Sequence, residues 1–214
     1  MTRRIPIIPT IIVALALAAM IALGIWQLDR RTEKEALLRQ YRANLSQPET
    51  AYPSNPTDSS YVFRTVKAHC LRPVSWQTKG GRMPDGKPGW RQIATCTTGA
   101  EGPGLMVDIG VSANPKAMPS WTGGDVRGTA VWEPDATSAL QRWLGHRPPQ
   151  RLMIVSDRGE AGLAPSARPD PAEVPNNHLA YAVHWFLFAG VAAIIYPLAL
   201  RRRNRSSKDA PPAA

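Results

Sequence analysis

The residues best suited to chemistry in this chain are its four histidines. One of them, His178, follows Asn176 and Asn177 where a long polar segment gives way to an apolar run. A neutral imidazole binds metal ions and haem iron, and polar side chains at the edge of a membrane span indicate a site because they are costly to place in lipid. A second interpretation stays open, in which the asparagines cap the helix and His178 lies in the wet interface.

Helical geometry selects the neighbours of this histidine. On a helix that begins near residue 177, His178 shares a face with Tyr181 and Trp185. His184 is rotated by roughly 120° from His178, so the two imidazoles do not form one ligand face, and His184 is interpreted as a packing residue. A histidine flanked by aromatic side chains at the outer membrane edge is a candidate axial ligand for a haem.

A haem bound at His178 also needs a cation for its propionates, and the N-terminal apolar segment ends in residues that can supply one. Arg30 and Arg31 follow the first apolar segment directly, and either guanidinium can pair with a propionate through two hydrogen bonds. Small residues on both segments would let the two helices approach closely. These small residues are Ala14, Ala18 and Ala22 in the first segment and Ala182, Ala189 and Ala193 in the second.

Signatures of known enzyme classes are missing from the sequence. It contains no G-x-S-x-G, no Walker loop, no H-E-x-x-H and no C-x-x-C-H for covalent haem attachment. Ser112 or Ser120 as a nucleophile would need a histidine and an acid that the sequence does not place. His69 and His146 lie in separate polar segments and are interpreted as surface residues. We expect a protein that is not an enzyme, and a catalytic site in the middle segment is the weakest alternative.

Both cysteines, Cys70 and Cys96, fall between the two apolar segments. In an oxidising compartment the natural interpretation is a disulfide, which would contribute a few kcal/mol to stability by closing the loop between them. A metal site that uses His69 beside Cys70 stays open as the alternative. A lone His-Cys pair lacks the ligand spacing of known metal motifs, so the disulfide is favoured.

Two apolar segments are long enough to cross a bilayer, which needs roughly 20 residues. Residues 5–28 and 179–200 carry no formal charge. The first segment follows two arginines as a signal peptide would, but it is longer than the roughly 7 to 15 apolar residues of a cleaved leader. We therefore expect transmembrane helices over 7–28 and 179–200, with a separate domain over 29–178 between them.

The net charge of +10 does not form a nucleic-acid-binding stripe. More than half of the excess lies beside the apolar segments, where basic residues orient helices and contact anionic lipid. The basic tail over 201–214 predicts a cytoplasmic C-terminus, and two spans return residues 1–6 to the same side. The expected protein is multi-pass, with the lipid bilayer as a partner and no nucleic acid.

Hydrophobic periodicity divides the central domain into a helical stalk and a β-rich body. The first helix is predicted to continue over 29–45, and short alternating segments predict a β-rich region over 61–156. A short helix is expected over 135–144, a turn-rich connection over 80–89 and a proline-rich linker over 165–175. The five strand candidates are residues 61–70, 90–97, 105–111, 128–132 and 152–156. The expected fold class is a membrane protein in which two transmembrane α-helices flank a periplasmic antiparallel β-rich domain, a small barrel or a sandwich, with a short helix.

Segments at the two membrane edges resemble signatures of one family. Residues 24–31, GIWQLDRR, are similar to its G-x-W-Q-L-x-R motif, and residues 175–186, PNNHLAYAVHWF, are similar to its N-N-H-L-x-Y-A-x-x-W-F motif. Residues 85–90, DGKPGW, resemble its central G-x-P-G-aromatic turn. On these motifs the chain is identified as a bacterial member of the surfeit locus protein 1 family over roughly residues 11–200.

Members of that family assist assembly of haem-copper oxidases, chiefly cytochrome c oxidase, and bacterial members are implicated in binding haem a and delivering it to subunit I. The resemblance implies a chaperone of respiratory-chain biogenesis in the bacterial inner (plasma) membrane. It implies haem a as a transient cofactor, with subunit I and the haem a synthesis enzyme as partners. By position, His178 is the family's haem-associated histidine and the expected ligand of the haem iron. The expected cofactor-binding residues are Trp26, Gln27, Arg30, His178, Tyr181 and Trp185.

The chain departs from the family pattern after the central turn. Where many members have V-x-R-G-W, residues 107–111 read VDIGV, so an arginine and a tryptophan are missing from the exposed domain. Capture of haem is expected to be reversible, because a cofactor that is handed on requires moderate affinity, and one histidine suits this better than two. The alternative function is a cofactor-free scaffold that stabilises an oxidase subunit during assembly.

Overall fold

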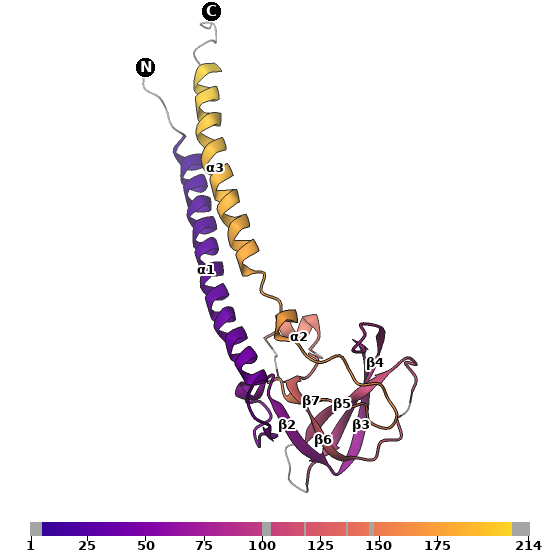
Figure 1. Ribbon diagram of the computed structural model, residues 1–214. Helices are drawn as coiled ribbons and strands as arrows, with labels where there is room; N and C mark the ends of the chain where they lie inside the picture. The colour runs from indigo at the N-terminus through magenta and orange to yellow at the C-terminus, as the bar shows by residue number, and fades with distance from the viewer. Residues whose placement is uncertain (1–5, 100–103, 118, 136, 146–147, 207–214) are drawn as a thin grey trace, which may run out of the picture. The chain divides into compact units, whose positions relative to one another are not determined.

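A computed structural model of the chain divides into two compact units (Figure 1). The first unit comprises Met1–Leu37 and Pro175–Ala214, and the second comprises Leu38–Val174. The predictions for His146, for the N-terminal residues 1–5 and for the tail beyond residue 206 lie outside the described residues. The structure describes residues 6–99, 104–117, 119–135, 137–145 and 148–206.

The first unit contains two long apolar helices. α1 is Ile7–Leu45 and α3 is His178–Ser206. Each is long and apolar enough to span a membrane. The two membrane-capable helices expected at the two ends of the sequence are therefore present, and α1 continues without a break through the predicted stalk into the second unit.

Residues with reduced exposure recur along both helices at alternating spacings of three and four, which is the seam of a coiled coil. Ala182 and Ala189 are buried on this seam, at 1% and 6% exposure, as the sequence predicts. The expected contact through three alanines of the first helix is wrong, because Ala14, Ala18 and Ala22 are exposed, as is Ala193. The small residue that α1 buries is instead Gly24. The seam residues are Thr10, Val13, Leu17, Met20, Gly24 and Gln27 on α1, and His178, Ala182, Trp185, Ala189, Ala192 and Tyr196 on α3.

The second unit is built on one mixed seven-stranded sheet with the order β1-β2-β6-β7-β5-β4-β3. Four of its six strand pairs are antiparallel, and the β1–β2 and β5–β7 pairs are parallel. Two apolar helices thus flank a β-rich domain with a short helix, α2, at Ala139–Trp143, which confirms the predicted fold class. The strands are β1 (Thr50–Ala51), β2 (Thr65–Cys70), β3 (Arg72–Arg82), β4 (Pro88–Thr97), β5 (Leu105–Ser112), β6 (Gly124–Trp132) and β7 (Leu152–Ser156).

The sheet curls into a barrel. Only Leu71 separates β2 from β3, yet these strands lie near opposite ends of the strand order. In a flat sheet β2 and β4 would be about 19 Å apart at the usual strand spacing. Instead Cys70 of β2 and Cys96 of β4 form a disulfide with Cα atoms 5.4 Å apart, and the Leu71 amide donates to the Thr97 carbonyl at 3.0 Å. Because one continuous sheet is drawn together in this way at the corner between β2 and β3, a small barrel is favoured over a sandwich, the alternatives that periodicity leaves open.

Strand β5, which lies between β7 and β4 in the sheet, is buried on both faces, whereas its sequence alternation predicts one buried face. Its odd-numbered residues are apolar and fully enclosed, as expected. On the other face, Met106 joins Ile93, Met153 and Val155 in a second buried cluster. Strand β5 therefore belongs to two layers of packing, which explains why it has no solvent-facing side within residues 105–111.

Sequence periodicity misses two strands, the two-residue β1 and the long β3. Most side chains of β3 are exposed on both faces, so it lacks the alternation that marks a half-buried strand. The glycines at 80 and 81, predicted as turn residues, lie inside it. A Cβ on Gly81 would lie 2.3 Å from Cγ of Arg91, whose Nε donates to buried Asp108 at 2.6 Å. Gly81 therefore leaves room for the arginine of a buried ion pair, and the true turn begins after Arg82.

Local capping explains two other boundaries. α2 begins at Ala139 instead of residue 135, because Ser138 accepts from the Gln141 amide at 3.2 Å while the Gln141 side chain accepts from the Ser138 amide at 2.9 Å. β2 begins at Thr65 instead of residue 61, because Ser59–Tyr61 forms a 3₁₀ turn.

Candidate functional site

The two sequence signatures meet in one hydrogen bond. Gln27 lies on the seam of α1, and His178 is the first residue of α3. Nδ1 of His178 and Oε1 of Gln27 are 2.8 Å apart. An amide oxygen only accepts, so the imidazole nitrogen carries the proton and donates. In neutral His178 the lone pair is then on Nε2, which is the form that binds a metal ion.

Asn176 and Asn177 precede the start of α3 and make different contacts. The Asn177 carbonyl accepts the first helical hydrogen bond, from the Tyr181 amide at 3.2 Å. Oδ1 of Asn176 is buried and has no hydrogen-bond partner in the described part of the chain. Asn176 therefore does not cap α3 through this oxygen. A buried acceptor without a donor costs free energy, and this oxygen is one of four side-chain atoms in the described residues in that condition.

Trp26 and Arg30 form a second pair, one turn apart on α1. The Arg30 guanidinium carbon lies 5.7 Å from the Trp26 ring centroid, a cation–π contact, and Nη1 donates to Glu33 at 2.7 Å. Arg31 makes a similar bond to Glu35, also at 2.7 Å. Exposed pairs of this kind contribute little, so an incoming carboxylate can replace the glutamate at small cost.

The aromatic residues expected beside His178 differ in their positions. Trp185 lies on the seam and packs edge-to-face on Phe188, with centroids 6.3 Å apart. Tyr181 is 56% exposed and so lies at the margin of the seam. His184 is exposed and donates from Nδ1 to the Ala180 carbonyl of its own helix at 2.6 Å. It is therefore off the seam, in agreement with its predicted separation from His178, and its ring lies 6.4 Å from that of Phe188 between centroids.

The cysteine site is a disulfide. Both sulfur atoms are used in the Cys70–Cys96 bond, so the alternative metal site with His69 is wrong. Nδ1 of His69 instead lies 2.6 Å from Asp125 on the neighbouring strand β6, and the pair is exposed. Within the described residues, no group of three or more His, Cys, Asp or Glu side chains is placed to hold a metal ion.

The signature residues on α1 and at the start of α3 together fit a haem by their donor chemistry. They supply one imidazole with a free nitrogen lone pair, aromatic side chains on both helices, and a guanidinium in an exchangeable ion pair. Axial ligation needs the first of these, and the propionates need the last. The sequence predicts the members of this set, whereas only the structure shows the bond that orients His178.

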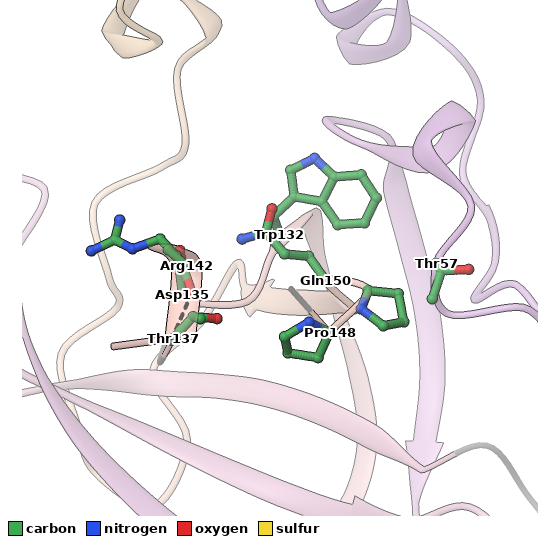
Figure 2. Close-up of a pocket in the computed structure, with 8 residues that line it drawn as sticks. Thr57, Trp132, Asp135, Thr137, Arg142, Pro148 and Gln150 are labelled. Atoms are coloured by element: carbon green, nitrogen blue, oxygen red, sulfur yellow. Dashed lines mark hydrogen bonds between the residues drawn. The ribbon is translucent and has the colours of Figure 1, made fainter. Parts of the chain in front are cut away.

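The second unit contains a separate cavity of about 610 Å³ that motif analysis misses (Figure 2). Figure 2 shows Arg142, Asp135 and Thr137 grouped together, with Trp132, Gln150 and Pro148 grouped beside them. Seven of the eight lining residues lie within 132–150 and one, Thr57, comes from elsewhere in the sequence, and no known motif marks them. The lining residues are Thr57, Trp132, Asp135, Thr137, Arg142, Pro148, Pro149 and Gln150.

A comparison with family models gives one match. The model of the SURF1 family matches residues 14–190, which is well over half of the chain and includes both signatures. No curated protein matches the chain. The matched range takes in most of α1, the whole second unit and the first half of α3.

Proposed function

The chain belongs to the SURF1 family, and we propose that it binds haem a through His178 and delivers it to subunit I of cytochrome c oxidase. The family is known for assembly of cytochrome oxidase and is a family of assembly factors, not a catalytic one. Its two apolar helices make the chain a membrane protein. Haem a is then a cargo, taken up by this protein and passed on.

The hydrogen bond between Gln27 and His178 is the observation that carries this proposal. It joins two residues that are 151 positions apart and belong to different signatures. Because Gln27 accepts from Nδ1, it orients the imidazole, and in the neutral ring the lone pair is on Nε2. Partners of this kind usually orient histidine ligands in metal sites.

The neighbouring residues have separate roles in the proposal. Trp26 and Trp185 would supply apolar contacts to the haem, and Arg30, now paired with Glu33, would supply a cation for a propionate. Asn176 would accept a hydrogen bond from a donor on the ligand. A single histidine ligand would make release to subunit I easier than two, as a carrier that gives up its cargo requires.

The proposed location is the inner membrane of a bacterium, with the second unit in the periplasm and both termini in the cytoplasm. Arginines at 201–203 and 205 follow the second apolar segment and favour a cytoplasmic C-terminus. The disulfide between Cys70 and Cys96 supports an oxidising compartment for the second unit. The haem a synthesis enzyme and subunit I are the proposed partners in the same membrane.

The test is a visible spectrum of the detergent-purified protein after co-expression with haem a synthesis enzymes. The parent is expected to show a haem a band that is lost or shifted in His178→Ala. His184→Ala is the matched control, because it removes an exposed histidine from the same helix, and it should keep the band. A colourless parent, with haem a confirmed in the same membranes, would leave the cofactor-free scaffold as the function.

A further inference from the structure

Strand β3 of the second unit has one edge without a partner strand. It is the last strand in the sheet order, and in the described part of the chain it pairs with β4 alone. Its register with β4 is continuous from Ser75 to Arg82, so the backbone groups of successive residues point alternately toward β4 and away from it. An unpaired edge of this kind can accept another extended chain as a further strand.

One hydrogen bond shows which residues of β3 point away from β4. The Arg82 carbonyl accepts from the amide of Ala167, which lies outside the β3–β4 hairpin, at 2.8 Å. Arg82 is opposite Pro88, which has no amide proton to donate to it. By alternation, the same outward direction holds for every second residue back along the strand. These residues, which we call the free edge of β3, are Gly80, Thr78 and Trp76.

Apolar surface lies beside the free edge. Trp76 is 37% exposed and packs edge-to-face on Trp121, with ring centroids 6.5 Å apart. Trp90 of β4 is 41% exposed and is opposite Gly80, where nothing lies within 4 Å of the position that a Cβ would take. A side chain from an added strand therefore has open space over Gly80, with an indole on either side of it. Strand addition would bury both indoles further.

The charge of β3 indicates what kind of strand fits. Its sequence, RPVSWQTKGGR, contains three cations and no acidic side chain. Within the described ranges, Arg72, Lys79 and Arg82 form no ion pair with another side chain. Acidic side chains on an added strand would gain cross-strand ion pairs with them. A second copy of β3 offers no acid in any register, and centred on Gln77 it would put Arg72 opposite Arg82, which is destabilising.

We propose that the free edge of β3 binds an extended segment of a partner protein that carries acidic side chains. The backbone of this segment bonds to the outward amides and carbonyls of the free edge and adds one strand to the sheet. Its apolar side chains cover Trp76 and the space over Gly80, and its carboxylates pair with the three cations of β3. This interaction is independent of the proposed haem site.

The test is binding of fluorescent peptides to the full chain in detergent, measured by fluorescence anisotropy. The probe is a short peptide of alternating glutamate and valine, and we expect the parent protein to bind it saturably. Two control peptides should bind about 10-fold more weakly, because each loses one part of the recognition. One is the same peptide with its alternate amides N-methylated, which cannot donate to the free edge, and the other alternates lysine and valine.

Variants of β3 separate strand addition from a general effect. Thr78→Pro removes an outward amide proton and leaves the bonds to β4, so it should keep the circular dichroism spectrum and raise the Kd of the acidic peptide about 10-fold. Thr78→Val is the matched control, because it keeps the amide and loses only the 3.2 Å side-chain contact with Gln92. It should bind as the parent does. Lys79→Glu should shift the preference toward the lysine peptide.

Three results would overturn the proposal. The first is a parent that does not bind the acidic peptide. The second is equal binding of the methylated and unmethylated acidic peptides, which would mean a surface that attracts anions, lipid headgroups included, without strand addition. The third is a parent that self-associates in sedimentation while Thr78→Pro does not, which would make a second copy of the chain the occupant.

Discussion

At the level of single residues, the bond between Gln27 and His178 decides which imidazole nitrogen can bind a metal. Gln27→Leu removes the acceptor and leaves ring orientation and tautomer unfixed. Loss of such a partner typically weakens metal binding about 10- to 100-fold. We expect haem titration of Gln27→Leu to give a Kd raised by that factor, with the protein still folded. Gln27→Glu keeps an acceptor and should bind more tightly than Gln27→Leu, and equal affinity of Gln27→Leu and the parent would contradict this role.

Tyr52 gives a residue-scale prediction in the second unit. Its hydroxyl donates to the Leu152 carbonyl at 2.8 Å, and burial raises the pKa of Tyr52 to about 12. The folded state therefore retains the phenol proton where the unfolded state loses it. This contribution to stability is fully present below the ordinary pKa of 10.0 and is lost as pH rises through about 12. Tyr52→Phe should cost about 1 kcal/mol at neutral pH.

Chemical denaturation of the parent and of Tyr52→Phe across the alkaline range measures this effect. The free energy of unfolding of the parent should fall more steeply above pH 10 than that of the variant, so the two curves converge. A constant difference between the curves throughout that range would show that burial of Tyr52 does not raise its pKa.

The sequence identifies the members of the candidate site but not their contacts. Trp26, Gln27, Arg30 and His178 are found through motif resemblance, and each lies at the end of an apolar segment. The pairing of Gln27 with His178 depends on the relative register of two helices, which no periodicity within either helix specifies. The unpaired oxygen of Asn176 was missed because asparagine before a helix has an ordinary role as a cap.

At the level of elements, the seam between α1 and α3 depends on Gly24. A Cβ at this position would lie 2.6 Å from Cε1 of Phe186. Inside a helix, alanine is normally more stable than glycine by up to about 1 kcal/mol. At position 24, however, the added Cβ would force the Phe186 ring to move. We expect Gly24→Leu to separate the helices and to weaken the Gln27–His178 bond. A distance measurement between spin labels on α1 and α3 should show a larger and broader separation.

Ala22→Leu is the matched control, because Ala22 is exposed on the same helix and should tolerate the larger side chain. Combining Gly24→Leu with Phe186→Ala should restore the parent distance by returning the lost space. If Gly24→Leu and Ala22→Leu gave the same distance distribution, Gly24 would not control the approach of the helices.

Elements with a clear burial pattern were predictable, and those without one were not. The sequence predicts the positions of the two apolar helices and of five strands, with boundaries that differ from the observed ones by several residues. β3 was missed because an exposed edge strand has no hydrophobic alternation, and its glycines resemble a turn. The predicted helix contact through Ala14, Ala18 and Ala22 rests on residue size alone. The seam instead follows the three-and-four spacing through Gly24.

At the level of the whole molecule, the Cys70–Cys96 disulfide closes the curled sheet between β2 and β4. The linked residues are separated by 26 positions, and a loop of this length contributes about 3.5 kcal/mol in the chain-entropy model. Cys70→Ala with Cys96→Ala should lower the free energy of unfolding of the second unit by about that amount. Urea denaturation followed by far-ultraviolet circular dichroism measures it.

Reductant provides the control for the double variant. It should lower the stability of the parent toward that of the double variant and leave the variant itself unchanged. A parent whose denaturation midpoint is insensitive to reductant, with its thiols shown to be free, would mean that the disulfide does not stabilise the barrel.

Imidazole rescue tests whether His178 is the ligand of the haem iron. His178→Gly leaves space where the ring stood, so added imidazole can occupy the ligand position. Haem titrated into this variant should give no histidine-ligated spectrum alone and should regain the parent band when imidazole is added. A His178→Gly protein that binds haem with the parent spectrum in the absence of imidazole would contradict the assignment of His178.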